Sequence, residues 1–294
     1  MSFIDKVYDL PRGGGTYKQL FQNVPALAPL YFSELEANYN PMAAKNWIAS
    51  HWEVPIGCVV VYLLGIYFGQ KFMEKVDYKN IWDTRNVLAL WNAFLCTFSW
   101  CGAIRTVPHL LYNLHSQSFQ STICTPPEGD WGIGATGLWV QLFVLSKIPE
   151  LIDTFFIVQR KRPLIFLHWY HHVTVLLYCW HAYSTEASQA LYFVAMNFTV
   201  HAVMYGYYCL MALKIKPPIP DFFITTMQIS QMIVGTFIQV ASMYYYEEGK
   251  CGVHYGNLIA GGLMYGSYFA LFFEFAYKRF ILNPKKKKAA EKKE

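Results

Sequence analysis

Long apolar runs constrain this chain more than any other feature, because each has the length of a helix that crosses a membrane. A helix needs about 20 apolar residues to span a hydrocarbon core of about 30 Å. Such runs lie at about 54–70, 87–115, 131–158, 163–183, 187–213, 221–246 and 255–277. Only 15% of the residues are charged, against about 25% in a soluble domain. The sequence therefore predicts an all-α, polytopic membrane protein with seven transmembrane helices.

The chain divides into three parts on composition. Residues 1–50 are mixed in character and broken by glycine and proline, residues 51–280 hold the apolar runs, and residues 281–294 form a basic tail. We find no cleavable signal peptide, because the first apolar run begins only near Val54 and no small-residue cleavage pattern precedes it. We therefore expect an N-terminal segment, one membrane domain and a short tail.

Basic residues predict the orientation in the membrane. They gather at 71–85, 159–163, 214–216 and 278–293, at the ends of the first, third, fifth and seventh runs, so all fall on one side. The positive-inside rule then places the C-terminus in the cytosol and the N-terminus in a lumen or outside. The net charge of +5 is thus a sign of topology, and we expect no nucleic-acid partner. The lysines of the tail suit a surface of anionic membrane lipid.

Two of the seven cysteines, Cys124 and Cys251, fall in the larger loops of the opposite, non-basic side. An oxidising lumen favours a disulfide between them, and two free thiols are the alternative. The other five lie within or beside the apolar runs.

Three histidines within five residues mark the fourth run. On a helix, His168, His171 and His172 stand at i, i+3 and i+4 and share one face. A buried polar group without a partner costs roughly 1–3 kcal/mol. Three imidazoles together in an apolar run therefore predict a functional site.

Neighbouring runs carry polar side chains at helical spacing as well. The third run has Lys147, Glu150, Asp153 and Thr154; the fifth has Asn197, His201, Tyr205 and Tyr208; the sixth has Thr225, Gln228, Gln231 and Gln239. Any one of these stripes alone is typical of hydrogen bonding between helices. Their convergence near the basic side predicts a polar chamber that opens to the cytosol, with an apolar cavity behind it.

Two chemistries suit such a chamber. A His-x-x-His-His motif is also found in di-iron membrane oxygenases, and neutral imidazoles bind iron or zinc. Those sites need several further histidines, and most of the others here map to loops or to the far ends of the runs, so we expect no metal. Histidine can instead form a covalent acyl intermediate, with neighbouring imidazoles moving protons and amides or tyrosines stabilising negative oxygen.

Four motifs, in order and spacing, resemble the very-long-chain fatty acid elongases, the 3-oxoacyl-CoA synthases of the endoplasmic reticulum. They are Lys147-Ile-Pro-Glu150-Leu-Ile-Asp153-Thr154 with Arg160-Lys161, then His168-Trp-Tyr-His171-His172, then Asn197-Phe-Thr-Val-His201-Ala-Val-Met-Tyr205-Gly-Tyr-Tyr208, then Thr225-Thr-Met-Gln228-Ile-Ser-Gln231. The resemblance runs from the first apolar run to the seventh and leaves out the first 50 residues.

The resemblance implies a condensation of acyl-CoA with malonyl-CoA to a 3-oxoacyl-CoA, CO₂ and CoA. It assigns the acyl group to His171 and a partner role to His201. Our own hypothesis is that His168, His172 and His201 orient His171 or transfer protons. The substrate-binding residues that the resemblance implies are Asn197, Tyr205, Tyr208, Gln228 and Gln231 in the chamber, Glu150 and Asp153 beside it, and Lys147, Arg160 and Lys161 for the phosphates of CoA.

The same resemblance implies the surroundings of the site. Six of the seven helices would enclose an acyl tunnel closed at its lumenal end, and Cys124 and Cys251 match disulfide positions of the family. We expect an endoplasmic reticulum membrane protein that needs no cofactor beyond its two CoA substrates. Its expected partners are the other enzymes of the elongation cycle, and a homodimer is left open.

Substrate choice rests on a short stretch. Leu164–His172 and Thr174–Tyr178 look most like the branch that extends saturated and monounsaturated chains of about palmitoyl length. Trp169 differs from the smaller residue common in polyunsaturated elongases. A polyunsaturated specificity stays an alternative, as does a metal-dependent oxidoreductase. A receptor would place its polar chamber outside, and a transporter would show broken helices or repeats; neither pattern is visible in the sequence.

Overall fold

A computed structural model describes residues 19, 24–31, 35–36, 38–247 and 250–282. Within these residues every regular element is a helix. The long helices are α4 (Glu53–Lys75), α5 (Arg85–Ser116), α7 (Gly134–Ser146), α9 (Phe166–Ser184), α10 (Ala190–Ala212), α11 (Asp221–Tyr245) and α12 (Tyr255–Ala276). Shorter ones are α3 (Met42–Ser50), α6 (Phe119–Cys124), α8 (Ile152–Gln159) and the π-helix η6 (Tyr277–Leu282). The tail lysines from Lys285 on lie outside the described residues.

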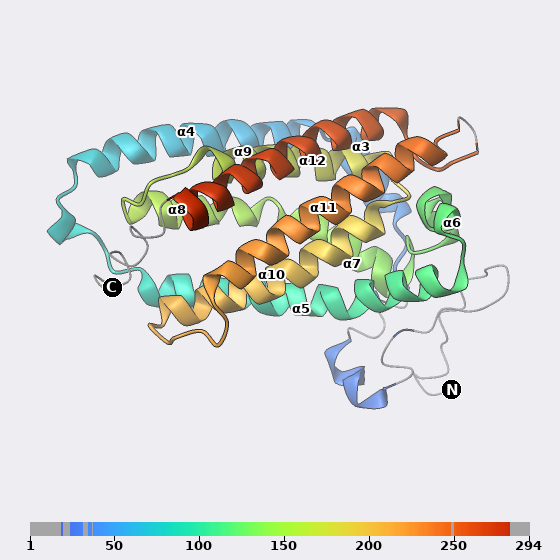
Figure 1. Cartoon of the computed structure of the whole chain (residues 1–294), viewed down its shortest axis with the longest axis horizontal. Coiled ribbons are helices and arrows are strands. Elements are labelled where there is room, and N and C mark those ends of the chain that lie inside the picture. The colour runs from blue at the N-terminus through green and yellow to red at the C-terminus, as the bar shows by residue number, and fades with distance from the viewer. Residues whose placement is uncertain (1–18, 20–23, 32–34, 37, 248–249, 283–294) are drawn as a thin grey trace.

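Six of these helices form a closed ring of neighbours. Going round, α5 packs on α10, α10 on α11, α11 on α12, α12 on α9, α9 on α7, and α7 on α5. Figure 1 shows the long helices lying side by side in one elongated bundle. The approach of α5 to α10 depends on Gly102, because a Cβ at that position would lie 2.4 Å from the ring of Phe198.

Helix α4 lies outside this ring. It packs on α8 and α9, and only Pro55 and Tyr62 are buried along its 23 residues. Its remaining side chains include a row of exposed apolar ones, which are Ile56, Val60, Val61, Leu63, Leu64, Phe68 and Phe72. Such a face suits contact with hydrocarbon rather than with water.

Four helices among the described residues are long and apolar enough to cross a membrane, namely α4, α5, α11 and α12 with η6. Helices α9 and α10 have sufficient length, at 19 and 23 residues, but polar side chains make them less apolar. This is therefore a helical protein with membrane-spanning character.

The third predicted span is wrong as a continuous helix. The structure ends α7 at Ser146, forms the 3₁₀ turn η5 at Pro149–Leu151, and begins α8 at Ile152. Pro149 explains the break, because proline lacks the N–H needed in a helix interior and its ring clashes with the preceding turn. The other six predicted runs each become one helix with ends within about five residues of those expected.

The two ends of the bundle differ in character. The loops 76–84, 160–165 and 213–220 lie at one end, called here the basic end, at the left of Figure 1. At the other end Cys124, closing α6, forms a disulfide with Cys251, which precedes α12. We call this the disulfide end.

A buried ion pair fixes part of the N-terminal segment to the bundle. Arg105 of α5 is 0% exposed and donates to Glu36 Oε1 at 2.6 Å. The same carboxylate oxygen accepts from the indole of Trp139 at 2.8 Å. This part of residues 1–50 therefore packs into the membrane domain instead of lying free beside it.

Candidate active site

The histidine box occupies the first two turns of α9. The rings of His168 and His172 have centroids 4.5 Å apart, and those of His171 and His172 are 5.7 Å apart. His172 is buried, and the other two are partly buried. The helical face predicted from the spacing is therefore present, and it is turned into the bundle.

His171 has an unusual environment within the box. Its Nδ1 atom is buried and has no hydrogen-bond partner among the residues that the structure describes. Its ring packs against Tyr268 of α12 with centroids 4.9 Å apart, and the Tyr268 hydroxyl donates to the backbone oxygen of His171 at 3.2 Å. An unpaired nitrogen inside the protein is the kind of group expected to meet a substrate, since leaving it unused costs stability.

A polar network lies across from His171, at the break between α7 and α8. Lys147 donates to Glu150 Oε1 at 2.7 Å, and Ser146 donates to the same oxygen at 2.8 Å. Lys147 also reaches Asn197 of α10 at 3.4 Å, and the Asn197 amide is 3.1 Å from Nε2 of His201. Since His171 lies within electrostatic range of Lys147, Glu150 and His201, the network and the box form one site.

Asp153 of α8 forms hydrogen bonds with side chains of α5 and α10 beside this network. Its two carboxylate oxygens accept from Trp91 of α5 at 2.6 Å and from Tyr205 of α10 at 2.8 Å. The Tyr205 ring is 5.3 Å from that of His201. Both carboxylate oxygens of Asp153 are therefore hydrogen bonded to neighbouring side chains.

The structure places the other predicted site residues outside this network. Lys161 donates to the backbone oxygen of Val76 at 2.5 Å, and Arg160 ends α8. Gln228 donates to the sulfur of Met204 at 3.3 Å, Gln231 is 7% exposed, and Tyr208 is 43% exposed. The structure thus separates an inner group around the histidines from Arg160, Lys161 and Tyr208, which lie nearer the basic end.

The basic side chains Arg279, Arg85 and Lys147 differ in the contacts that they make. Arg279 pairs with Asp221 at 2.7 Å, and both lie within electrostatic range of Tyr208. Arg85 hydrogen bonds the exposed Asp83 and so holds the pKa of that carboxyl below its usual value. Lys147, by contrast, is 2% exposed and bonded within the protein. Lys147 thus belongs to the inner group, and its contact with a phosphate of CoA stays a prediction.

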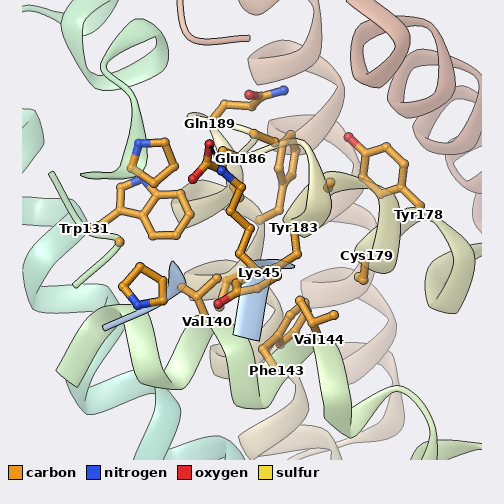
Figure 2. Close-up of a pocket in the computed structure, with 18 of the residues that line it drawn as sticks. Lys45, Trp131, Val140, Phe143, Val144, Tyr178, Cys179, Tyr183, Glu186 and Gln189 are labelled. Atoms are coloured by element: carbon orange, nitrogen blue, oxygen red, sulfur yellow. Dashed lines mark ion pairs between the residues drawn. The ribbon is translucent and has the colours of Figure 1, made fainter. Parts of the chain in front are cut away.

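An apolar pocket lies between the inner site and the disulfide end. Its cavity volume is about 60 Å³, below the range of roughly 300–1,000 Å³ for ligand pockets, so an acyl chain would have to widen it. Phe143 and Val144 line it one turn from Lys147, and Lys147 Nζ lies 3.9 Å from the centre of the Phe143 ring. In Figure 2, Lys45 crosses the lining toward Glu186, with which it forms an ion pair at 2.5 Å.

Three residues of the site are missing from the sequence-based set: Tyr62 of α4, Trp91 of α5 and Tyr268 of α12. Each is a single aromatic residue on an apolar helix, and such a residue usually packs, so the sequence carries no signal for it. No group of three or more histidine, cysteine, aspartate or glutamate side chains in the described part of the chain is placed to hold a metal ion.

Comparison with known proteins identifies the family. Residues 47–288 match the family model described as ELO, the GNS1/SUR4 family. The chain is 40% identical to very long chain fatty acid elongase 6 of Drosophila melanogaster, over 85% of this chain and 79% of that protein. It is 41% identical to putative fatty acid elongase 3 of Caenorhabditis elegans, over 83% and 75%. It is 36% identical to very long chain fatty acid elongase 6 of Homo sapiens, over 88% and 96%. The chain therefore belongs to the ELO family of very long chain fatty acid elongases.

Proposed function

We propose that this protein condenses acyl-CoA with malonyl-CoA to a 3-oxoacyl-CoA two carbons longer, through an acyl-imidazole on His171. One observation carries this proposal: the ring of His171 keeps a buried nitrogen without a partner, beside a network with a lysine, an amide and a second imidazole. Family membership supports the reaction class, since the similar proteins are named fatty acid elongases.

The first half-reaction loads the enzyme. A ring nitrogen of His171 attacks the thioester carbonyl, the C–S bond breaks, and CoA leaves as the thiolate, which takes up the proton of the ring. Charge that develops on the carbonyl oxygen needs donors already in place. The Asn197 amide and the Lys147 ammonium, 3.4 Å from the Asn197 oxygen, are the groups we assign to it, with Glu150 orienting the lysine.

The second half-reaction forms the new carbon–carbon bond. Malonyl-CoA loses CO₂, the resulting enolate carbon attacks the acyl carbon, and the C–N bond to His171 breaks. The released imidazolate takes up one proton from solvent, which returns the enzyme to its starting state with a neutral imidazole. We assign the binding of malonyl-CoA to His201, because it lies on α10, across the ring from α9, within electrostatic range of His171.

The acyl tail is proposed to occupy the apolar pocket, with the CoA group at the basic end. Phe143 and Val144 place the start of the pocket beside the site. The ion pair of Lys45 with Glu186 marks its far limit. This arrangement suits seven spans in an endoplasmic reticulum membrane, with the basic end in the cytosol and the pocket directed toward the lumen.

The decisive experiment uses the purified full-length protein with palmitoyl-CoA and labelled malonyl-CoA. We expect His171→Ala to abolish both 3-oxoacyl-CoA formation and retention of the acyl group on the protein. His181→Ala is the matched control, since it removes an imidazole from the last turn of the same helix and should keep the activity. Condensation at a normal rate by His171→Ala would contradict the mechanism.

Substrate preference is a separate proposal. We assign saturated and monounsaturated chains of about palmitoyl length, with polyunsaturated chains as the alternative. A panel of acyl-CoA substrates that varies length and unsaturation separates the two. A kcat/KM highest for a polyunsaturated chain would favour the alternative and leave the mechanism untouched.

A further inference from the structure

The peripheral helix α4 reaches the histidine box through one side chain. Tyr62 is 8% exposed, although most of the helix faces outward. Its hydroxyl lies 2.8 Å from Thr154 Oγ1 of α8. That oxygen lies in turn 2.9 Å from Nε2 of His168. The contacts make a chain of hydrogen bonds that runs from Tyr62 through Thr154 to the box.

The direction of this chain follows from counting protons. A phenol hydroxyl has one proton to donate, and Tyr62 has Thr154 as its hydrogen-bond partner. If Tyr62 donates, Thr154 accepts that bond and donates its own proton to Nε2 of His168. Nε2 then carries no hydrogen, and the neutral ring holds its proton on Nδ1.

The opposite direction is less favourable. If Nε2–H of His168 donated to Thr154, then Tyr62 and Thr154 would have two hydroxyl protons but only one bond between them, so one of the two protons would have no acceptor among the described residues. The cost of an unsatisfied buried donor corresponds to a preference of about fivefold to 150-fold for the first direction. The two hydroxyls therefore select one tautomer of His168.

We propose that Tyr62 and Thr154 are positioning residues that hold His168 in the Nδ1–H form and fix its ring against His172. The ring centroids of the two histidines are 4.5 Å apart, so the orientation of one constrains the other. The inference rests on the proposed function, because it explains what fixes the ring orientations of His168 and His172 beside His171.

A purely structural role for Tyr62 is the competing explanation. Tyr62 is the main buried contact of α4, so its loss could loosen that helix without any effect on chemistry. The two roles differ in their readouts. A structural role lowers the melting temperature with kcat unchanged in the folded enzyme, whereas a positioning role lowers kcat with little change in melting temperature or KM.

The test compares Tyr62→Phe, Thr154→Val, Thr154→Ser and the double variant Tyr62→Phe/Thr154→Val in the full-length purified protein. We expect Tyr62→Phe and Thr154→Val each to lower kcat by about tenfold with KM changed less than about twofold. The double variant should equal Thr154→Val alone, because both changes break one chain. Thr154→Ser keeps the hydroxyl and should restore most of the rate.

Tyr67→Phe is the matched control. It removes the same hydroxyl from the same helix at a position 51% exposed, and its kcat should match that of the wild type. The proposal is overturned if Tyr62→Phe and Thr154→Val keep kcat within about twofold of the wild type. It is also overturned if their losses disappear at a temperature where the variants are fully folded.

The tautomer itself gives a readout independent of activity. ¹⁵N-histidine labelling should show His168, assigned by its loss in His168→Gln, as the Nδ1–H form in the wild type and as a mixture in Thr154→Val. An Nε2–H form in the wild type would refute the inference even if the enzyme condenses. A wild type with no condensation activity, but with the expected tautomer, would instead refute the proposed function alone.

Discussion

At the scale of single residues, the polar groups of the inner site are joined to one another by hydrogen bonds and an ion pair. Lys147 and Glu150 are 2% and 4% exposed, and their ion pair is one bond from the amide that contacts His201. A buried charge is tolerable only when it is paired and hydrogen bonded. The pair therefore contributes to stability and to the electrostatics of the site at once.

These two contributions can be separated by mutation. Lys147→Met leaves the Glu150 carboxylate buried without its cation, which should lower the free energy of unfolding by about 3–5 kcal/mol, and Glu150→Met should do the same for the lysine. The double variant Lys147→Met/Glu150→Met leaves no unpaired charge and should be more stable than either single variant. All three should be inactive. Thermal unfolding in detergent, beside the condensation assay, measures both properties.

A different ranking would contradict this view of the pair. If each single variant melted at the temperature of the wild type, the ion pair would be unimportant for stability. If the double variant kept condensation activity, neither charge would act on the reacting carbonyl.

The sequence spacing predicted that Lys147 and Glu150 lie together, but it did not predict the backbone structure around them. The i, i+3 relation of Lys147 and Glu150 was predicted on one continuous helix, whereas the structure places Lys147 just after α7 and Glu150 in the 3₁₀ turn η5. Pro149 lies between them and was visible in the sequence. Tyr62, Trp91 and Tyr268 could not be predicted, because their roles depend on which helices meet, and periodicity does not specify that.

At the scale of helices, close approach depends on the size of one side chain. A Cβ on Gly102 would lie 2.4–2.6 Å from atoms of the Phe198 ring, and Phe198 is 2% exposed, with little room to move. Helices α5 and α10 carry Trp91 and Tyr205, the two donors to Asp153. Their separation therefore sets the geometry beside the site.

Gly102→Ala should force the two helices apart. We expect a loss of about 1–3 kcal/mol in the free energy of unfolding from overpacking. Gly65→Ala on α4 is the matched control, because a Cβ there has no atom within 4 Å. That change should be neutral or slightly stabilising through helix propensity. Melting temperatures of the two variants in the same detergent check the prediction, and a Gly102→Ala variant as stable as Gly65→Ala would contradict it.

Helix boundaries were the most predictable part of the fold. The sixth and seventh runs, expected at 221–246 and 255–277, became helices Asp221–Tyr245 and Tyr255–Ala276. Proline and charge at their ends mark these limits in the sequence itself. The ring order of the helices was not predictable, since each helix presents several apolar faces and the sequence does not say which neighbour covers which.

At the scale of the whole molecule, the number of spans decides where the site meets the cytosol. Four helices of the described chain meet the length and apolarity of a membrane span. Only an odd number of crossings puts the two termini on opposite sides of the membrane. We propose seven, with the polar side chains of the broken helix α7–α8 and of α9 and α10 turned to the inside of the bundle, away from lipid.

Glycosylation mapping tests this topology directly. The chain's one Asn-x-Ser/Thr sequence, Asn197-Phe198-Thr199, lies within α10, so the wild type should carry no glycan. We expect an acceptor site on a flexible insert at the N-terminus, or in the loop before α12, to be glycosylated in microsomes. The same insert at the C-terminus or at residues 214–218 should stay unmodified. Modification of both termini, or of neither, would mean an even number of spans, and it would place the basic end and the disulfide end in the wrong compartments for cytosolic CoA.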